Sequence, residues 1–160
     1  MKRGSTIFLQ AVIVLIGIGA LAFLLWEPHL EGRNANATLF QIYFNDPFLA
    51  YVYMASILFF GALYQAFKLL GCIGRNEIFS QRSVKALGTI KYCAISLAAL
   101  IVAAEAYLCI AVRGKDDVAG GVAIGLFLIF TSAIIAAAAA VFEKLLQSAV
   151  DIKAENDLTV

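Results

Sequence analysis

The chain has 160 residues, of which 62% are hydrophobic and 14% charged, and its mean hydropathy is +0.90. A soluble domain is nearer half apolar and a quarter charged, so this composition excludes an ordinary soluble globule. A formal net charge of +1 without a basic cluster gives no electrostatic footprint for a polyanion, which argues against direct nucleic-acid binding. We therefore expect a protein embedded in the lipid bilayer.

The first hydrophobic segment, residues 7–26, contains twenty residues without a charge. At about 1.5 Å rise per residue, a helix of this length covers the roughly 30 Å hydrocarbon core of a bilayer. The segment is longer than the apolar region of a cleavable signal peptide. We therefore expect it to be retained as a membrane helix.

Three further segments are long and apolar enough to cross the membrane, at about residues 47–70, 92–112 and 118–142. Within them only Lys68 and Glu105 are charged. Asp46 and Pro47 suit a helix start, because Asp caps free amides and Pro needs no amide partner in the first turn. The predicted architecture is all-α, a single membrane domain over residues 1–160 built as a four-helix bundle.

Two amphipathic stretches are expected on one side of the membrane. Ser80 is suited to cap a short interfacial helix that leads into the third span. After the fourth span, an amphipathic tail is predicted over residues 143–154, since one helical face carries Phe142, Leu145, Leu146, Ala149 and Ile152. The last residues, 155–160, are expected to fray.

The distribution of cations predicts the orientation of the spans. Nine Lys and Arg residues fall before the first span, at the end of the second span (Lys68) or in the loop that follows it, and after the fourth span, whereas three fall on the other side, namely Arg33, Arg113 and Lys115. The positive-inside rule therefore places the N- and C-termini in the cytoplasm. Aromatic residues near the predicted outer interface agree with this orientation, and they are Trp26, Tyr43, Tyr51 and Tyr53.

Glu105 is the one acidic residue inside a predicted span and is the first candidate for a functional site. It lies about eight residues from the outer end of its helix, or roughly 12 Å deep by helical rise. Counting from the helix ends places it level with Ser56, Gly17, Gly19 and Gly125. The carboxyl could bind a ligand or a proton with Ser56 or Tyr53 as its partner, or it could be a neutral group that donates a structural hydrogen bond.

A second polar layer is predicted nearer the cytoplasm, with one residue from each helix: Gln10, Gln65, Ser96 and Ser132. Such residues usually join membrane helices by hydrogen bonds, so we interpret the layer as structural. On the fourth helix, Gly121 and Gly125 form a small-residue motif that predicts close helix packing within the chain, with homodimerisation as the alternative.

Few residues could hold a metal or carry out catalysis. The single His and the three Cys lack the spacing of a zinc site. The sequence contains no phosphate-binding glycine motif, no HExxH and no GxSxG. We therefore expect no metal, no cofactor and no enzymatic activity.

Several stretches resemble the bacterial family catalogued as domain of unknown function 2975. They are Tyr64–Leu70, Asn76–Ser80, Ser83–Leu87, Ile90–Tyr92 and Asp151–Val160. The resemblance spans nearly the whole chain and implies a four-helix protein of the bacterial cytoplasmic (inner) membrane. It implies no reaction, but members are often encoded beside small helix-turn-helix regulators, which implies a cytoplasmic regulatory protein as a candidate partner.

The function expected from these observations is non-enzymatic action through protein contacts in regulation or sensing. The alternative is a small transporter, or a ligand- or proton-binding membrane protein, that uses Glu105. The expected partners are the lipid bilayer, a cytoplasmic regulatory protein and a second copy of the chain.

Overall fold

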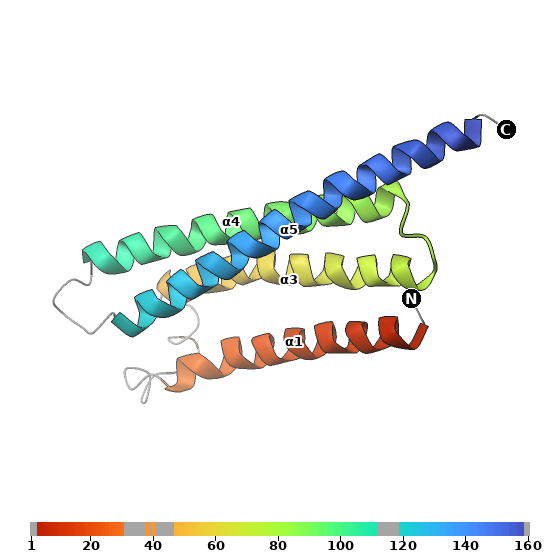
Figure 1. Cartoon of the computed structure of the whole chain (residues 1–160). Coiled ribbons are helices and arrows are strands. Elements are labelled where there is room, and N and C mark those ends of the chain that lie inside the picture. The colour runs from red at the N-terminus through yellow and green to blue at the C-terminus, as the bar shows by residue number, and fades with distance from the viewer. Residues whose placement is uncertain (1–2, 31–37, 39, 41–46, 112–118, 159–160) are drawn as a thin grey trace.

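The computed structural model describes residues 3–30, 38, 40, 47–111 and 119–158, and its secondary structure there consists of four long helices (Figure 1). They are α1 (Arg3–Leu30), α3 (Pro47–Gly74), α4 (Gln81–Ala111) and α5 (Ala119–Leu158). Each is long and apolar enough to cross a membrane, so the predicted all-α architecture of four membrane-capable helices is confirmed. The three cations on the predicted outer side and Tyr43 lie outside the described residues.

The helices pack in chain order, α1 against α3, α3 against α4, and α4 against α5. The start of α1, the 75–80 connection and the end of α5 lie at one end of the bundle, which we call the terminal end (Figure 1). The opposite end, which carries Leu30, Pro47, Ala111 and Ala119, is the distal end. Both ends of the helical chain therefore lie on the same side of a membrane that the bundle crosses.

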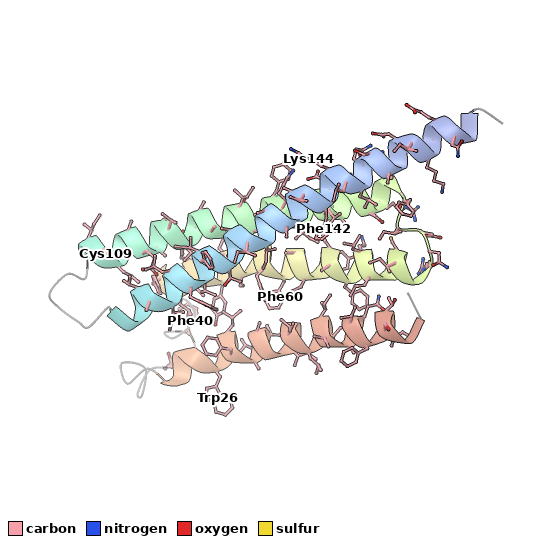
Figure 2. The ribbon with its side chains drawn as sticks, in the orientation of Figure 1. Trp26, Phe40, Phe60, Cys109, Phe142 and Lys144 are labelled. Atoms are coloured by element: carbon pink, nitrogen blue, oxygen red, sulfur yellow. The ribbon has the colours of Figure 1, made fainter. Side chains whose placement is uncertain are left out.

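Small residues bring α1 close to α3 near the terminal end. A Cβ atom at Gly74 would lie 3.1 Å from Cγ2 of Thr6, and Thr6 is buried. One turn further along α1, the Gln10 amide Nε2 donates a hydrogen bond to the Phe67 carbonyl at 3.3 Å. At the distal end of α1, Trp26 points away from the other helices (Figure 2), as suits an interfacial ring.

The end of α3 has a specific chemical cause. Asn76 adopts a left-handed conformation with φ of 59°. The Glu77 amide donates to the Cys72 carbonyl at 2.8 Å, and the Asn76 amide donates to the Ile73 carbonyl at 3.1 Å. These two bonds form a Schellman motif, which satisfies carbonyls that a helix end would otherwise leave free.

Ser80 precedes α4, as its predicted capping role requires. Its carbonyl accepts hydrogen bonds from the amides of Ser83 at 3.0 Å and Val84 at 3.3 Å, and the hydroxyls of Ser80 and Ser83 lie 3.3 Å apart. The predicted interfacial stretch and the third span form one unbroken helix, since α4 continues from Gln81 to Ala111.

An apolar cluster joins α4 and α5 near the terminal end. Its buried members are Val84, Leu87 and Leu146, and partly buried neighbours are Leu69, Ile78 and Val150. The tail therefore differs from its predicted single face, because Leu146 is buried here while Phe142, Leu145 and Ile152 are exposed. The helix also continues to Leu158, four residues beyond its predicted end at Ala154.

The helices are staggered at the distal end. The Tyr51 hydroxyl on α3 donates to the Leu100 carbonyl on α4 at 2.7 Å, and a Cβ at Gly61 would lie 3.8 Å from Sγ of Cys93. Counting helical rise from these two contacts shows that α4 extends roughly 6–10 Å beyond the first residue of α3. Figure 1 shows the same offset, with α4 and α5 reaching further than α1 and α3.

Candidate functional site

The interface between α4 and α5 holds two carboxylates, and each lies against a glycine of the opposite helix. Glu105 of α4 lies on Gly125 of α5, where a Cβ atom would overlap the carboxyl group and lie 3.1 Å from Cγ. Glu143 of α5 lies on Gly88 of α4, where a Cβ atom would be 2.8 Å from the carboxylate Oε1. Both glycines are buried, so the missing side chain makes room for the acid in each case.

The two arrangements are reciprocal because α4 and α5 run in opposite directions. Gly88 and Glu105 are 17 residues apart on α4, and Gly125 and Glu143 are 18 residues apart on α5. A pseudo-twofold axis across the helix pair therefore relates one carboxylate–glycine pair to the other. The two halves can be compared residue by residue.

Glu143 has a cation as its partner. The Lys91 ammonium Nζ lies 2.6 Å from Glu143 Oε2, and the two side chains are 20% and 25% exposed. The same ammonium lies 4.4 Å from the centre of the Tyr92 ring, within the range of a cation–π contact. Lys91 follows Gly88 by three residues, one turn along the same face of α4.

This ion pair lies within the apolar layer of the bundle. Cys93, two residues after Lys91 on α4, lies against Gly61 of α3. Two residues after Gly61, Leu63 lies against Gly17, near the middle of α1, and a Cβ atom at Gly17 would be 3.7 Å from Cδ1 of Leu63. Lys91 is therefore level with the middle of the α1 apolar segment. Charged residues at such depth are costly unless paired, which gives a reason for the short contact with Glu143.

This ion pair was not predicted from the sequence. Lys91 immediately precedes the third predicted span, residues 92–112, and Glu143 immediately follows the fourth, residues 118–142. Two features of the sequence could have indicated the pair, namely the opposite charges of the two residues and their matched positions on neighbouring antiparallel helices.

Glu105 has no comparable partner among the residues that the structure describes. The pseudo-twofold axis relates Lys91 to Leu128, which follows Gly125 by three residues and carries no charge. The Glu105 Oε2 atom is buried and has no hydrogen-bond partner in the described part of the chain. Because most buried polar side-chain atoms have a partner, this oxygen is an exception that requires an explanation.

The predicted partners of Glu105 make other hydrogen bonds. The Tyr53 hydroxyl donates to the Leu24 carbonyl of α1 at 3.0 Å, and the Ser56 hydroxyl donates to the Tyr53 carbonyl at 2.7 Å. Neither bond involves Glu105. The binding role proposed for Tyr53 and Ser56 with this acid stays a prediction that these hydrogen bonds do not support.

The predicted depth of Glu105 needs a correction. Of the glycines expected around it, Gly125 is in contact, whereas Gly17 lies against Leu63, and no described residue lies within 4 Å of a Cβ at Gly19. The stagger places Glu105 level with the first turn of α3, roughly 10 Å from the level of Ser56. The prediction measured depth as the number of residues from each helix end and assumed that the helix ends are level. The helix ends are offset, so the depths differ.

The predicted polar layer is not assembled as a layer. Gln10 bonds to the backbone of α3, Gln65 is half-buried, Ser96 is exposed and Ser132 is buried. Within the described ranges, no hydrogen bond joins any two of these four residues. The same stagger explains this, because equal depths counted from helix ends are not equal depths in the bundle.

The glycine motif of α5 is divided between two environments. Gly125 packs against Glu105, whereas Gly121 is exposed and no described residue lies within 4 Å of a Cβ at that position. Only Gly125 of the pair therefore serves packing within the described chain.

The chemistry available at the α4–α5 interface is that of a single free carboxylate. Across the described residues, no three His, Cys, Asp or Glu side chains gather in a way that could hold a metal ion. Glu105 can accept a hydrogen bond or pair with one cation, in the way that Glu143 pairs with Lys91. The arrangement is one for binding a small charged or hydrogen-bonding group.

Residues 30–160 match the family described as Protein of unknown function (DUF2975), and the match begins at the last residue of α1. The chain is also 46% identical over 161 residues to the Uncharacterized membrane protein YoaS of Bacillus subtilis (strain 168), with 100% of both chains covered. No solved structure matches the chain. The predicted resemblance is thus confirmed, and this chain belongs to the DUF2975 family, whose function is unknown.

Proposed function

We propose that this chain is a non-enzymatic, multi-pass protein of the bacterial cytoplasmic (inner) membrane, with both termini in the cytoplasm. It acts in regulation or sensing by contacting a cytoplasmic protein through its terminal end. The observation that carries this proposal is the shape of α5, which continues as one helix to Leu158 and extends past the other three helices (Figure 1).

The projecting part of α5 has an apolar stripe available for contact. The apolar cluster holds Leu146 and Val150 against the rest of the bundle. Leu145 and Ile152 point elsewhere and are 62% and 66% exposed. They are seven residues apart, which places them on one stripe two turns in length.

Polar groups flank this stripe. Asp151 and Lys153 are exposed, and the Gln147 amide Nε2 donates to Asp151 Oδ1 at 2.7 Å. An apolar stripe between charged flanks is the surface with which one amphipathic helix recognises another helix or a groove. Because this helix is already formed, binding does not require the ordering of a disordered segment, and the entropic cost is low.

Site-specific photo-crosslinking in native membranes tests the proposal. A photoreactive amino acid at Ile152 is expected to form a discrete adduct with a protein other than this chain, and Leu145→Asp is expected to abolish it. The matched control is Leu126, an apolar residue of α5 within the predicted span that is 59% exposed, against 66% for Ile152. Adducts with lipid alone at both positions would contradict the proposal, and adducts with a second copy alone would replace it by homodimerisation.

A second candidate function is ligand or proton binding at Glu105. It is supported by the buried Oε2 atom, which lacks a partner in the described part of the chain. This function is separable from the first, because Glu105 lies near the distal end and Ile152 near the terminal end. Glu105→Gln is therefore expected to leave the crosslink at Ile152 unchanged.

A further inference from the structure

We infer that Glu105 binds a primary ammonium group, supplied by the ethanolamine headgroup of a lipid or by a free amine. The inference goes beyond the protein contacts proposed for the terminal end. It rests on the second candidate function, for which it names the class of ligand. It is supported by the difference between the two halves of the α4–α5 interface.

The half around Glu143 shows what a carboxylate on a glycine binds in this protein. There, the ammonium of Lys91 lies 2.6 Å from the carboxylate, and it comes from the residue three positions after Gly88. In the other half, the corresponding residue is Leu128, so the chain supplies no cation at that position. The Glu105 Oε2 atom has no hydrogen-bond partner in the described ranges. The second half therefore repeats the carboxylate–glycine pair of the first and lacks its ammonium.

The chemistry of the site favours an ammonium over other cations. A buried carboxylate without a partner is unfavourable, and a compact cation with N–H donors both neutralises it and forms a hydrogen bond. An ammonium carries three donors on a single atom, whereas a guanidinium is a larger planar group. A quaternary ammonium has no N–H and cannot form the bond. A primary ammonium is thus the group that matches the contact seen at Glu143.

The position of Glu105 makes it accessible from the edge of the membrane. It is level with the first turn of α3, and among the four described helices α4 and α5 are the ones that continue beyond this level. Leu128, which follows Gly125 by one turn of α5, is 44% exposed, so the surface of α5 next to this carboxylate faces the surroundings of the bundle. The apolar span of α3 begins at Phe48, so Glu105 is level with one end of a span, where lipid headgroups and dissolved amines meet a membrane protein.

Thermal unfolding of the full chain in lipid nanodiscs tests the inference. The reference discs contain phosphatidylcholine, whose headgroup is the quaternary counterpart of ethanolamine. Replacing half of it by phosphatidylethanolamine, or adding methylammonium to the reference discs, is expected to raise the midpoint by about 2–4 °C. Tetramethylammonium is expected to have no effect. A response to the lipid alone identifies the headgroup as the source, and a response to methylammonium alone identifies a free amine.

Two variants separate binding at Glu105 from a general effect of lipid. Glu105→Gln keeps the size of the side chain and is expected to remove the response to both ligands. Leu128→Lys places an ammonium at the position that the pseudo-twofold axis relates to Lys91. The variant is therefore expected to raise the midpoint of thermal unfolding in reference discs and to remove the response to phosphatidylethanolamine and methylammonium. Leu126→Lys is the matched control, because it adds the same charge on the same helix but on a different face, about 100° around the helix axis from Gly125.

Three results would overturn the inference. The first is an equal response of the wild type and Glu105→Gln. The second is the absence of any response of the wild type to either ligand. The third is an equal effect of Leu128→Lys and Leu126→Lys on the midpoint. If Leu128→Lys does not fold, the comparison of Glu105→Gln with the wild type still tests whether Glu105 binds the ammonium group. Loss of the amine response leaves the crosslink at Ile152 as an independent test of the protein-contact function.

Discussion

Replacing Gly125 by Ala tests whether the Glu105 carboxyl lies on this glycine. The added Cβ would overlap the carboxyl group and lie 3.1 Å from Cγ of Glu105. Overpacking of this kind costs about 1–3 kcal/mol. Exchange of Gly for Ala inside a helix contributes about 0.5–1 kcal/mol in the opposite direction. We therefore expect Gly125→Ala to lower the free energy of unfolding by about 1 kcal/mol, taking the middle of both ranges.

Gly121 provides a matched control on the same helix. No described residue lies within 4 Å of a Cβ at this position, so Gly121→Ala gains the helical preference of Ala without a clash. It is expected to raise the free energy of unfolding by about 0.5–1 kcal/mol. The two exchanges are chemically identical, and the difference between them, about 2 kcal/mol, isolates the contact with Glu105.

Reversible unfolding in mixed detergent micelles measures both values. A double variant, Glu105→Ala with Gly125→Ala, adds a further check, because the methyl group added by Gly125→Ala enters the volume that the carboxyl vacates. The cost of Gly125→Ala is then expected to disappear in the Glu105→Ala background. Equal unfolding free energies for Gly121→Ala and Gly125→Ala would refute the reasoning, since they would show that the carboxyl does not occupy this position.

Further predictions concern the ion pair, the end of α3 and the orientation. Lys91→Met and Glu143→Gln are each expected to lower the thermal midpoint, since each leaves one charge unpaired in the apolar layer, whereas the double variant recovers part of the loss; additive losses would show that the groups are not coupled. Asn76→Val is expected to destabilise the protein by about 1–2 kcal/mol, because φ at this position is 59°, and Asn76→Gly is expected to have little effect. Equal unfolding free energies for these two variants would contradict the left-handed conformation. A membrane-impermeant maleimide is expected to label Asn156→Cys, in a chain without its native cysteines, in inverted vesicles but not in intact cells; the reverse result would place the terminal end outside.

The four helices could be predicted from hydropathy because a bilayer requires long uncharged segments, and few alternatives satisfy that requirement. The contact between Glu105 and Gly125 could also be anticipated. Glu105 lies six residues before the last residue of α4, and Gly125 lies six residues after the first residue of α5, so the contact between them shows that the distal ends of these two helices are level. Counting from those ends therefore gave the correct depth for this pair.

The same count failed between helices that are offset. Ser56 and Gly17 belong to α3 and α1, whose distal ends lie short of those of α4 and α5, so equal distances from the ends did not mean equal depth. The ion pair between Lys91 and Glu143 was missed for a related reason. In the sequence, each residue lies just outside an apolar segment. In the packed bundle, both residues are level with the middle of the α1 apolar segment, which the sequence alone does not show.

The offset of α4 and α5 relative to α1 and α3 has a consequence for the surrounding lipid. A flat bilayer of uniform thickness cannot match the ends of both helix pairs at once, so lipid beside one pair must stretch, compress or follow a tilt of the bundle. The free energy of that deformation depends on acyl-chain length. The α3–α4 contacts that set the offset, such as the one between Tyr51 and Leu100, therefore couple the packing of this protein to the thickness of its membrane.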